Sequence, residues 1–124
     1  MSEILGNLKG IRNSVIEELK TLYDMKLTSG QLLSAELALK LADITDFINR
    51  EISVYITRSG QIIKVVVGSN ETVELPAVEG RRGSSRLSGI RCVHTHPSGA
   101  PALSGVDISA LKSNRFDCMV AIGV

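Results

Sequence analysis

The chain has 124 residues, 44% of them apolar and 22% charged, a composition typical of one globular domain. Fourteen basic and thirteen acidic side chains leave a net charge of +1, so no overall field favours nucleic acid or an acidic membrane. No segment approaches the roughly 18 apolar residues of a membrane span, and residues 1–20 lack the apolar region of a signal peptide. We therefore expect a cytoplasmic protein with no membrane partner.

Two helices are expected first in the chain. The apolar residues of segment 11–23 recur at steps of four, four, three and one, which places them on one helix face. After "KLTSGQ" interrupts this pattern, apolar residues repeat at helical spacing from Leu37 to Ile48. Ser34 is a suitable N-cap for this second helix, and Glu36 lies in its first turn, where the helix dipole favours a negative charge.

The pattern changes to strands at Glu51. The β-branched runs "EISVYIT" and "QIIKVVVG", joined by "RSG", predict a hairpin. "ETVELP" is compatible with a further short strand, whereas "VEGRRGSSRLSG" has the composition of a polar loop. "IRCVHTH" then predicts a buried strand that ends at Pro97, residues 104–111 predict a short helix, and "CMVAIGV" predicts a last buried strand.

This order of elements predicts an α/β sandwich, a mixed sheet with flanking helices in one domain that spans residues 1–124. Because the sequence stops inside an apolar run, we expect a fragment truncated in or after a strand, with a downstream domain beyond it. Cys92 and Cys118 lie in apolar runs and are expected to be buried, reduced thiols rather than a disulfide.

The segment "CVHTHPSGAPALSGVD" contains the only histidines of the chain. On a strand, residues i and i+2 project from the same face, so His94 and His96 can direct their rings to one point. Zinc needs a third protein ligand if a water is to keep the fourth position, and Asp107 is the natural candidate. Zinc held there would lower the pKa of its water to about 7 and polarise a carbonyl.

Hydrolysis at such a site also needs an oxyanion stabiliser and a base. Ser104 lies close to Asp107 in the sequence and can donate to the oxyanion. Glu51, at the start of the first hairpin strand, is the best placed carboxylate for a base that is not itself a ligand. Glu71, Glu74 and Glu79 are weaker candidates because they lie in or beside the polar loop.

Each of these residues also has a simpler interpretation. The two histidines can be core residues bonded to backbone carbonyls, and Ser104 with Asp107 has the form of a capping box. Glu51 can be a charged residue that faces water at a helix-to-strand junction. Cys92 falls on the same strand face as the histidines, either as a soft metal ligand or as a packed thiol. The coincidence of all these features favours a metal site.

The string "HTHPSGAPALSGVD" resembles the signature of JAMM (MPN-type) metalloproteases, which include deubiquitinating isopeptidases. It also looks like the related RadC proteins, with Leu103 where those proteins usually have proline. In the JAMM family two histidines and an aspartate bind zinc, a serine stabilises the tetrahedral intermediate, and an upstream glutamate is the base. The resemblance implies a JAMM/MPN-like fold and an amide or isopeptide substrate. By position it implies the zinc ligands His94, His96 and Asp107 and the catalytic residues Ser104 and Glu51.

A second resemblance covers nearly the whole chain. The chain resembles the N-terminal extension of certain bacterial HflX-type GTPases. The segments that carry this resemblance are "GNLKGIRNSVIEELKTLYDMKL", "GQLLSAELALKLAD", "INREISVYITRSGQI", "RRGSSRLSGIRCVHTHPSG" and "LSGVDISALKSNRFDCMVAIGV". That family binds ribosomes and hydrolyses GTP through a downstream domain, and the resemblance implies the source of the chain but not what this extension does. The sequence has no G-x-x-x-x-G-K-[ST] phosphate loop, and GTP binding is not implied for it.

Arg81, Arg82, Arg86 and Arg91 lie within eleven residues, among glycines and serines. Such a cluster can bind the phosphates of an RNA partner, but it has no aromatic neighbour for base stacking and can equally be a solvated loop. Two functions therefore stay open. The first is a zinc-dependent hydrolase, and the second is a non-catalytic module that presents the arginine loop to a ribosome or to its own GTPase domain.

Overall fold

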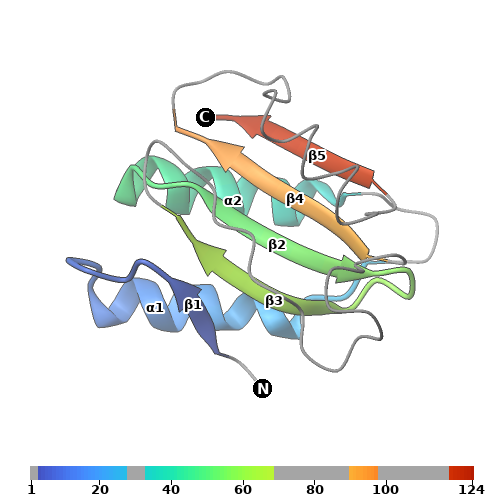
Figure 1. The fold of residues 1–124 in the computed structure, drawn as a ribbon, viewed down its shortest axis with the longest axis horizontal. Helices are drawn as coiled ribbons and strands as arrows, with labels where there is room; N and C mark the ends of the chain where they lie inside the picture. The colour runs from blue at the N-terminus through green and yellow to red at the C-terminus, as the bar shows by residue number, and fades with distance from the viewer. Residues whose placement is uncertain (1–2, 28–32, 69–89, 98–117) are drawn as a thin grey trace.

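The computed structural model describes residues 3–27, 33–68, 90–97 and 118–124. In these residues five strands form one mixed sheet, and two α-helices lie on one of its faces, so the fold is α/β as expected (Figure 1). The strands are β1 (Ile4–Gly6), β2 (Ile52–Thr57), β3 (Ile62–Val67), β4 (Ile90–His96) and β5 (Cys118–Gly123), in the sheet order β1-β3-β2-β4-β5. The outer pairs β1/β3 and β4/β5 are parallel, and the two inner pairs are antiparallel.

Both expected helices are confirmed, with one difference at the end of the first. Helix α1 (Asn13–Lys20) continues as the 3-10 helix η1 (Thr21–Asp24), so the apolar stripe ends on a tighter turn. Helix α2 (Ala35–Ile48) begins as the sequence indicates, because the Ser34 hydroxyl accepts a hydrogen bond from the Leu37 amide at 3.1 Å. It ends at Asn49, whose φ of 54° is left-handed and turns the chain toward β2.

The expected hairpin and the buried strand β4 are confirmed as well, and β5 forms where expected, but Met119 is buried while residues 120–124 are only partly buried. β2 and β3 pair antiparallel across a turn in which Gly60 has a φ of +90°. A Cβ atom at Gly60 would meet the Leu27 carbonyl oxygen at 2.0 Å, so this turn requires glycine. β1 was not expected, because three residues are too short to show a period.

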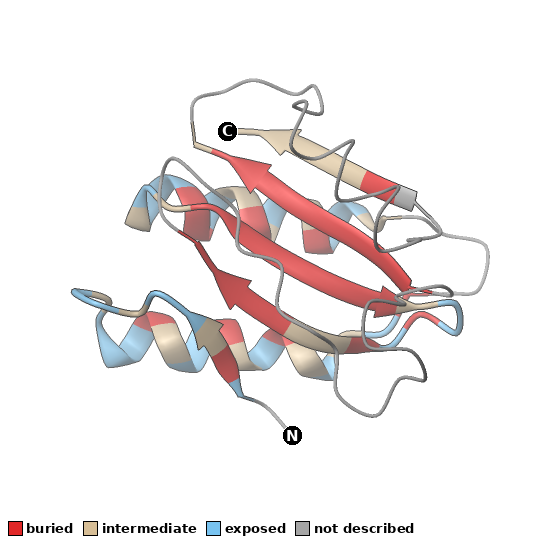
Figure 2. Cartoon of the chain, viewed as in Figure 1, coloured by how far each residue is buried: buried red, intermediate tan, exposed pale blue. Residues whose placement is uncertain are grey.

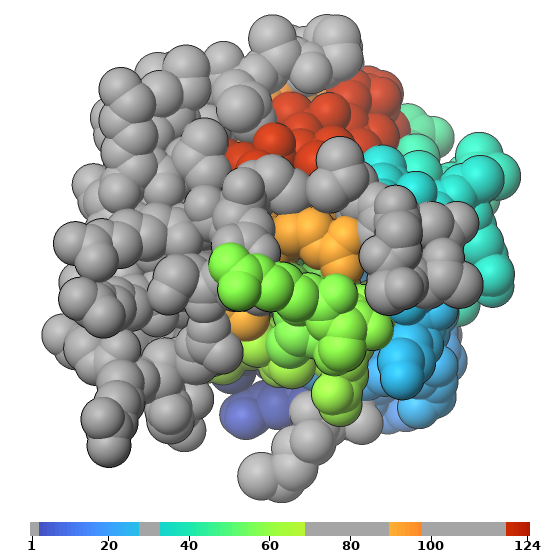
Figure 3. Space-filling view, turned by 90° about the vertical axis from the view of Figure 1, so that its right-hand side faces the viewer, coloured from blue at the N-terminus to red at the C-terminus, as the bar shows by residue number. Residues whose placement is uncertain are grey.

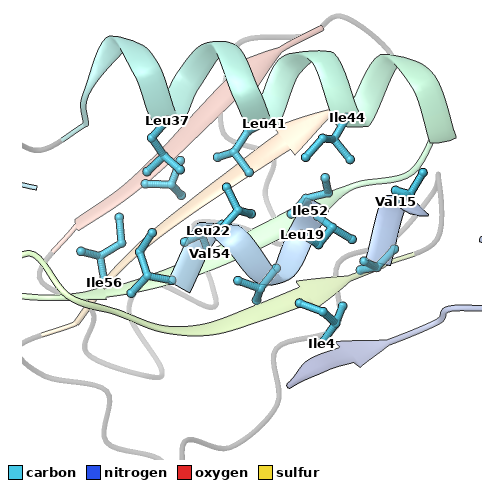
Figure 4. Packing of buried hydrophobic residues seen from close by; sticks show 14 of the residues in the cluster. Ile4, Val15, Leu19, Leu22, Leu37, Leu41, Ile44, Ile52, Val54 and Ile56 are labelled. Atoms are coloured by element: carbon cyan, nitrogen blue, oxygen red, sulfur yellow. The ribbon is translucent and has the colours of Figure 1, made fainter. Parts of the chain in front are cut away.

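The helices cover an apolar face of the sheet. Leu37, Leu41 and Ile44 of α2 point toward the strands, and Ile52 and Val54 of β2 meet them from the sheet (Figure 4). The central strands are buried along almost their whole length (Figure 2). Because side chains alternate along a strand, the residues between these apolar ones project from the sheet face that is turned away from the helices.

Several expectations concern residues outside the described ranges. These are the short strand in "ETVELP", the polar loop and the helix in 104–111, together with Glu71, Glu74, Glu79, Arg81, Arg82, Arg86, Ser104 and Asp107. In the part of the chain that the structure describes, no helix has the length and apolar character needed to cross a membrane.

Candidate metal centre

Strand β4 holds the two histidines on one face, as the alternation predicts. Their ring centroids lie 4.7 Å apart, and the ring planes are tilted by 34°. His94 is fully buried and His96 is 8% exposed. The strand ends at His96, directly before Pro97, so the pair lies at the carboxyl end of β4. Two imidazoles are therefore held side by side in a position sheltered from water.

The sheet register brings Glu51 next to this pair. β2 and β4 are antiparallel with Ser53 opposite His94, and the same register extended toward the start of β2 sets Glu51 opposite His96. Residues opposite each other in neighbouring strands project from the same face, so the Glu51 side chain shares the histidine face. Glu51 is only 8% exposed. The alternative interpretation, a glutamate that faces water, is therefore wrong.

The backbone around Glu51 is fixed on both sides. The Glu51 carbonyl accepts a hydrogen bond from the Gly68 amide at 2.8 Å, and the following amide, of Ile52, donates to the Thr95 hydroxyl at 3.0 Å. Upstream, the left-handed Asn49 donates its amide to the Thr45 carbonyl at 2.7 Å and closes α2. Glu51 is thus tied to both neighbouring strands before β2 begins.

We call the sheet face that carries these residues the polar face. On β2 and β4 it carries Glu51, Ser53, Tyr55, Cys92, His94 and His96, all of them buried, and the apolar residues Val66 of β3 and Met119 of β5 adjoin them on the same face. On β5, Ala121 and Gly123 lie beside His94 and His96 and are the smallest side chains next to the pair. Buried ionisable residues are uncommon unless they are paired or functional. The polar face therefore gathers buried ionisable side chains of the two central strands, whereas the helix-covered face is mostly apolar.

The donor set of the polar face fits zinc. Imidazole nitrogen and carboxylate oxygen are both common zinc ligands. A mixed set of this kind favours neither the softer nor the harder metal ions. Within the described ranges, no three histidine, cysteine, aspartate or glutamate side chains are grouped closely enough to hold a metal. His94, His96 and Glu51 therefore do not form a metal-binding group by themselves, and the expected third ligand, Asp107, lies outside the described residues.

Arg91 does not belong with the other three arginines. It lies inside β4, is 7% exposed, and its Nη2 donates to the Thr57 carbonyl at 3.0 Å. Figure 3 looks onto this end of the sheet, where β4 lies between the β2–β3 hairpin and β5. The expectation that Arg91 is part of a solvated, phosphate-binding loop is wrong, because it occupies a strand position and bonds the neighbouring strand.

Tyr55 gives the polar face a measurable pH dependence. Burial raises the pKa of the Tyr55 hydroxyl far above its usual value near 10, and negative charge at the opposite residue, Cys92, raises this pKa further. The unfolded tyrosine ionises near pH 10 while the folded one resists ionisation, so its contribution to stability is complete below pH 10. It is lost as the pH rises from there toward the folded pKa.

We expect the free energy of unfolding of the native protein to fall more steeply above pH 10 than that of the variant Tyr55→Phe. The difference approaches about 1.4 kcal/mol per pH unit for one buried hydroxyl. Urea denaturation of both proteins between pH 8 and pH 11 measures it. Parallel curves over this range would contradict the assignment to Tyr55.

The sequence did not single out two polar residues near the site, Thr45 and Thr95. Both are fully buried, and their hydroxyl oxygens lie 2.6 Å apart. The sequence does contain an indication of Thr95. Because side chains alternate along β4, the residue between the two histidines must face the apolar side, and a threonine puts a hydroxyl there. Thr45 carried no such signal, because a threonine in a helix is commonly exposed.

Comparison of the chain with protein-family models, with curated proteins and with solved structures found no match. The inference of function therefore depends on the residues of the polar face and on the motif that carries its histidines.

Proposed function

We propose that this chain is a zinc-dependent amide or isopeptide hydrolase of the JAMM (MPN) type, part of the N-terminal region of an HflX-like GTPase. The observation that carries the proposal is the burial of Glu51, just before β2, and of both histidines of the paired strand β4, whose ring centroids lie 4.7 Å apart. Two neutral nitrogen ligands and a separate carboxylate are the parts that such a hydrolase needs. The spacing to Ser104 and Asp107 supports the same reaction.

Each residue has one role in this proposal. His94 and His96, together with Asp107, hold the zinc ion, which when bound supplies an activated water and polarises the scissile carbonyl. Glu51 accepts a proton as the carbonyl is attacked and returns it to the leaving nitrogen. Ser104 donates a hydrogen bond to the oxygen on which negative charge develops.

The burial of Glu51 and the histidines suits this chemistry. A site sheltered from water strengthens the attraction between a cation and a carboxylate, since the local dielectric is lower than that of water. It also limits competing exchange of protons with solvent. A carboxylate on β2 and two imidazoles on β4 are attached to separate strands of one sheet, so their relative positions are set by strand pairing rather than by flexible loops.

The variant Glu51→Gln tests the proposed base. Glutamine keeps the shape of the side chain but cannot accept the proton, so turnover should fall on the order of 100-fold or more. Zinc should still bind at about one ion per chain, because the three proposed ligands, His94, His96 and Asp107, remain. Turnover is measured on a panel of fluorogenic peptide amides and ε-lysyl isopeptides, and zinc by elemental analysis.

Glu36→Gln is the matched control, because Glu36 is an exposed residue in the first turn of α2 and should leave turnover unchanged. Native turnover in Glu51→Gln would remove Glu51 from the role of base. A native protein that binds zinc and cleaves no member of the panel would instead support a non-catalytic interaction module.

A further inference from the structure

Thr95 lies between the two histidines in β4, and the alternation of the strand turns its side chain to the opposite, helix-covered face. There it meets Thr45 of α2, with 2.6 Å between the two hydroxyl oxygens, and both residues are fully buried. The Thr95 oxygen also accepts the hydrogen bond from the Ile52 amide at 3.0 Å. Two hydroxyls in an apolar core are costly unless they are bonded, and these two are bonded to each other and to the backbone.

The bond to Ile52 bears directly on Glu51. The Glu51 carbonyl and the Ile52 amide belong to the same planar peptide unit. Gly68, after β3, holds the carbonyl at 2.8 Å, and Thr95, on β4, holds the amide at 3.0 Å. Rotation of this peptide plane changes the backbone angles on both sides of it, and with them the direction in which the Glu51 side chain leaves the chain. The two bonds therefore fix that direction.

We infer that Thr95 and Thr45 are positioning residues that set the Glu51 carboxylate opposite His96. This inference rests on the proposed function, since it concerns the residue proposed as the base. Thr95 holds the peptide plane, and Thr45 holds the Thr95 hydroxyl in the orientation that accepts the Ile52 amide. α2 thereby contributes to the geometry of the site although it lies on the other face of the sheet.

Zinc alone is a sufficient probe, because a carboxylate held beside a cation strengthens its binding. Residues outside the metal's own ligands commonly change metal affinity by about 10- to 100-fold. We expect Thr95→Val, which has nearly the same volume but no hydroxyl, to weaken zinc binding on the order of tenfold. Thr95→Ser, which keeps the hydroxyl, should restore the native dissociation constant. In a Glu51→Gln background, Thr95→Val should have no further effect.

Val93→Ala is the matched control for lost packing, because Val93 lies on the same strand and the same face as Thr95 but has no hydroxyl. It should reduce stability and leave the zinc dissociation constant unchanged. Thr45→Val keeps the Thr95 hydroxyl that accepts from the Ile52 amide, so it should weaken zinc binding by a smaller factor than Thr95→Val. It replaces Thr95→Val if that variant does not fold.

Each other outcome decides against the inference in a distinct way. If Thr95→Val weakens zinc binding equally in the native protein and in the Glu51→Gln variant, the threonine acts on the histidines rather than on Glu51. Native zinc affinity in both valine variants would overturn the inference and leave the proposed function standing. A native protein that binds no zinc would overturn the proposed function and this inference together.

Discussion

Replacing both histidines by alanine, in His94→Ala/His96→Ala, should reduce the zinc content from about one ion per chain to none. The two rings lie 4.7 Å apart on one strand face, and zinc sites in proteins need at least three protein ligands. Loss of two of these ligands therefore leaves too few to hold the ion. The measurement is elemental analysis of protein purified without chelator and without a nickel column.

The matched control for this pair is Cys92→Ala. Cys92 is fully buried on the same strand and the same face, two residues before His94, and it should not change the zinc content if it is a packed thiol. Zinc retained in the double histidine variant would place the metal elsewhere in the chain. If the native protein contains no zinc and does not bind zinc tightly on titration, the histidines are core residues rather than metal ligands.

The second large effect is on stability. We expect Leu41→Ala to lower the free energy of unfolding by about 2–5 kcal/mol, which is a large part of the total for a domain of this size. Leu41 is fully buried in the middle of α2 and points toward the sheet (Figure 4). Its truncation leaves a cavity that the rigid sheet beneath it cannot fill.

Leu39→Ala, in the same helix, is the matched control. Leu39 is 66% exposed, and its truncation should change stability by less than about 0.5 kcal/mol. Urea denaturation of the three proteins gives the comparison. A similar loss in both variants would contradict the placement of the α2 stripe against the sheet.

Much of this fold could be predicted because its elements are long enough to show a period. The helical spacing in α2, the hairpin composition and the apolar runs of β4 and β5 each extend over several residues. β1 could not be predicted from three residues. Nor could its place at the edge beside β3, since β1 and β3 pair over a separation of about sixty residues in the chain and local pattern contains no information on such a contact.

The candidate site was predictable only in part, for a similar reason. The common face of His94 and His96 depends on strand alternation alone, which the sequence contains. The placement of Glu51 on the face that carries His96 depends on the register between two strands, and a shift of one residue would turn Glu51 to the other face. Arg91 differs from its prediction because it lies inside an apolar strand, where its guanidinium bonds the neighbouring strand instead of facing solvent.

The alternation in β2 and β4 also has an evolutionary consequence. Residues that build the core, such as Ile52 and Val93, and residues of the polar face, such as Glu51 and His94, follow one another along the same strands and project from opposite faces of the sheet. Selection for stability and selection for the proposed reaction therefore act mainly on alternating positions, with Thr95 as an exception that lies on the core side and bonds the backbone beside Glu51. Under the proposed function, a descendant chain that exchanges the histidines and Glu51 for apolar residues would give up the reaction while the apolar residues of its helix-covered face stay the same.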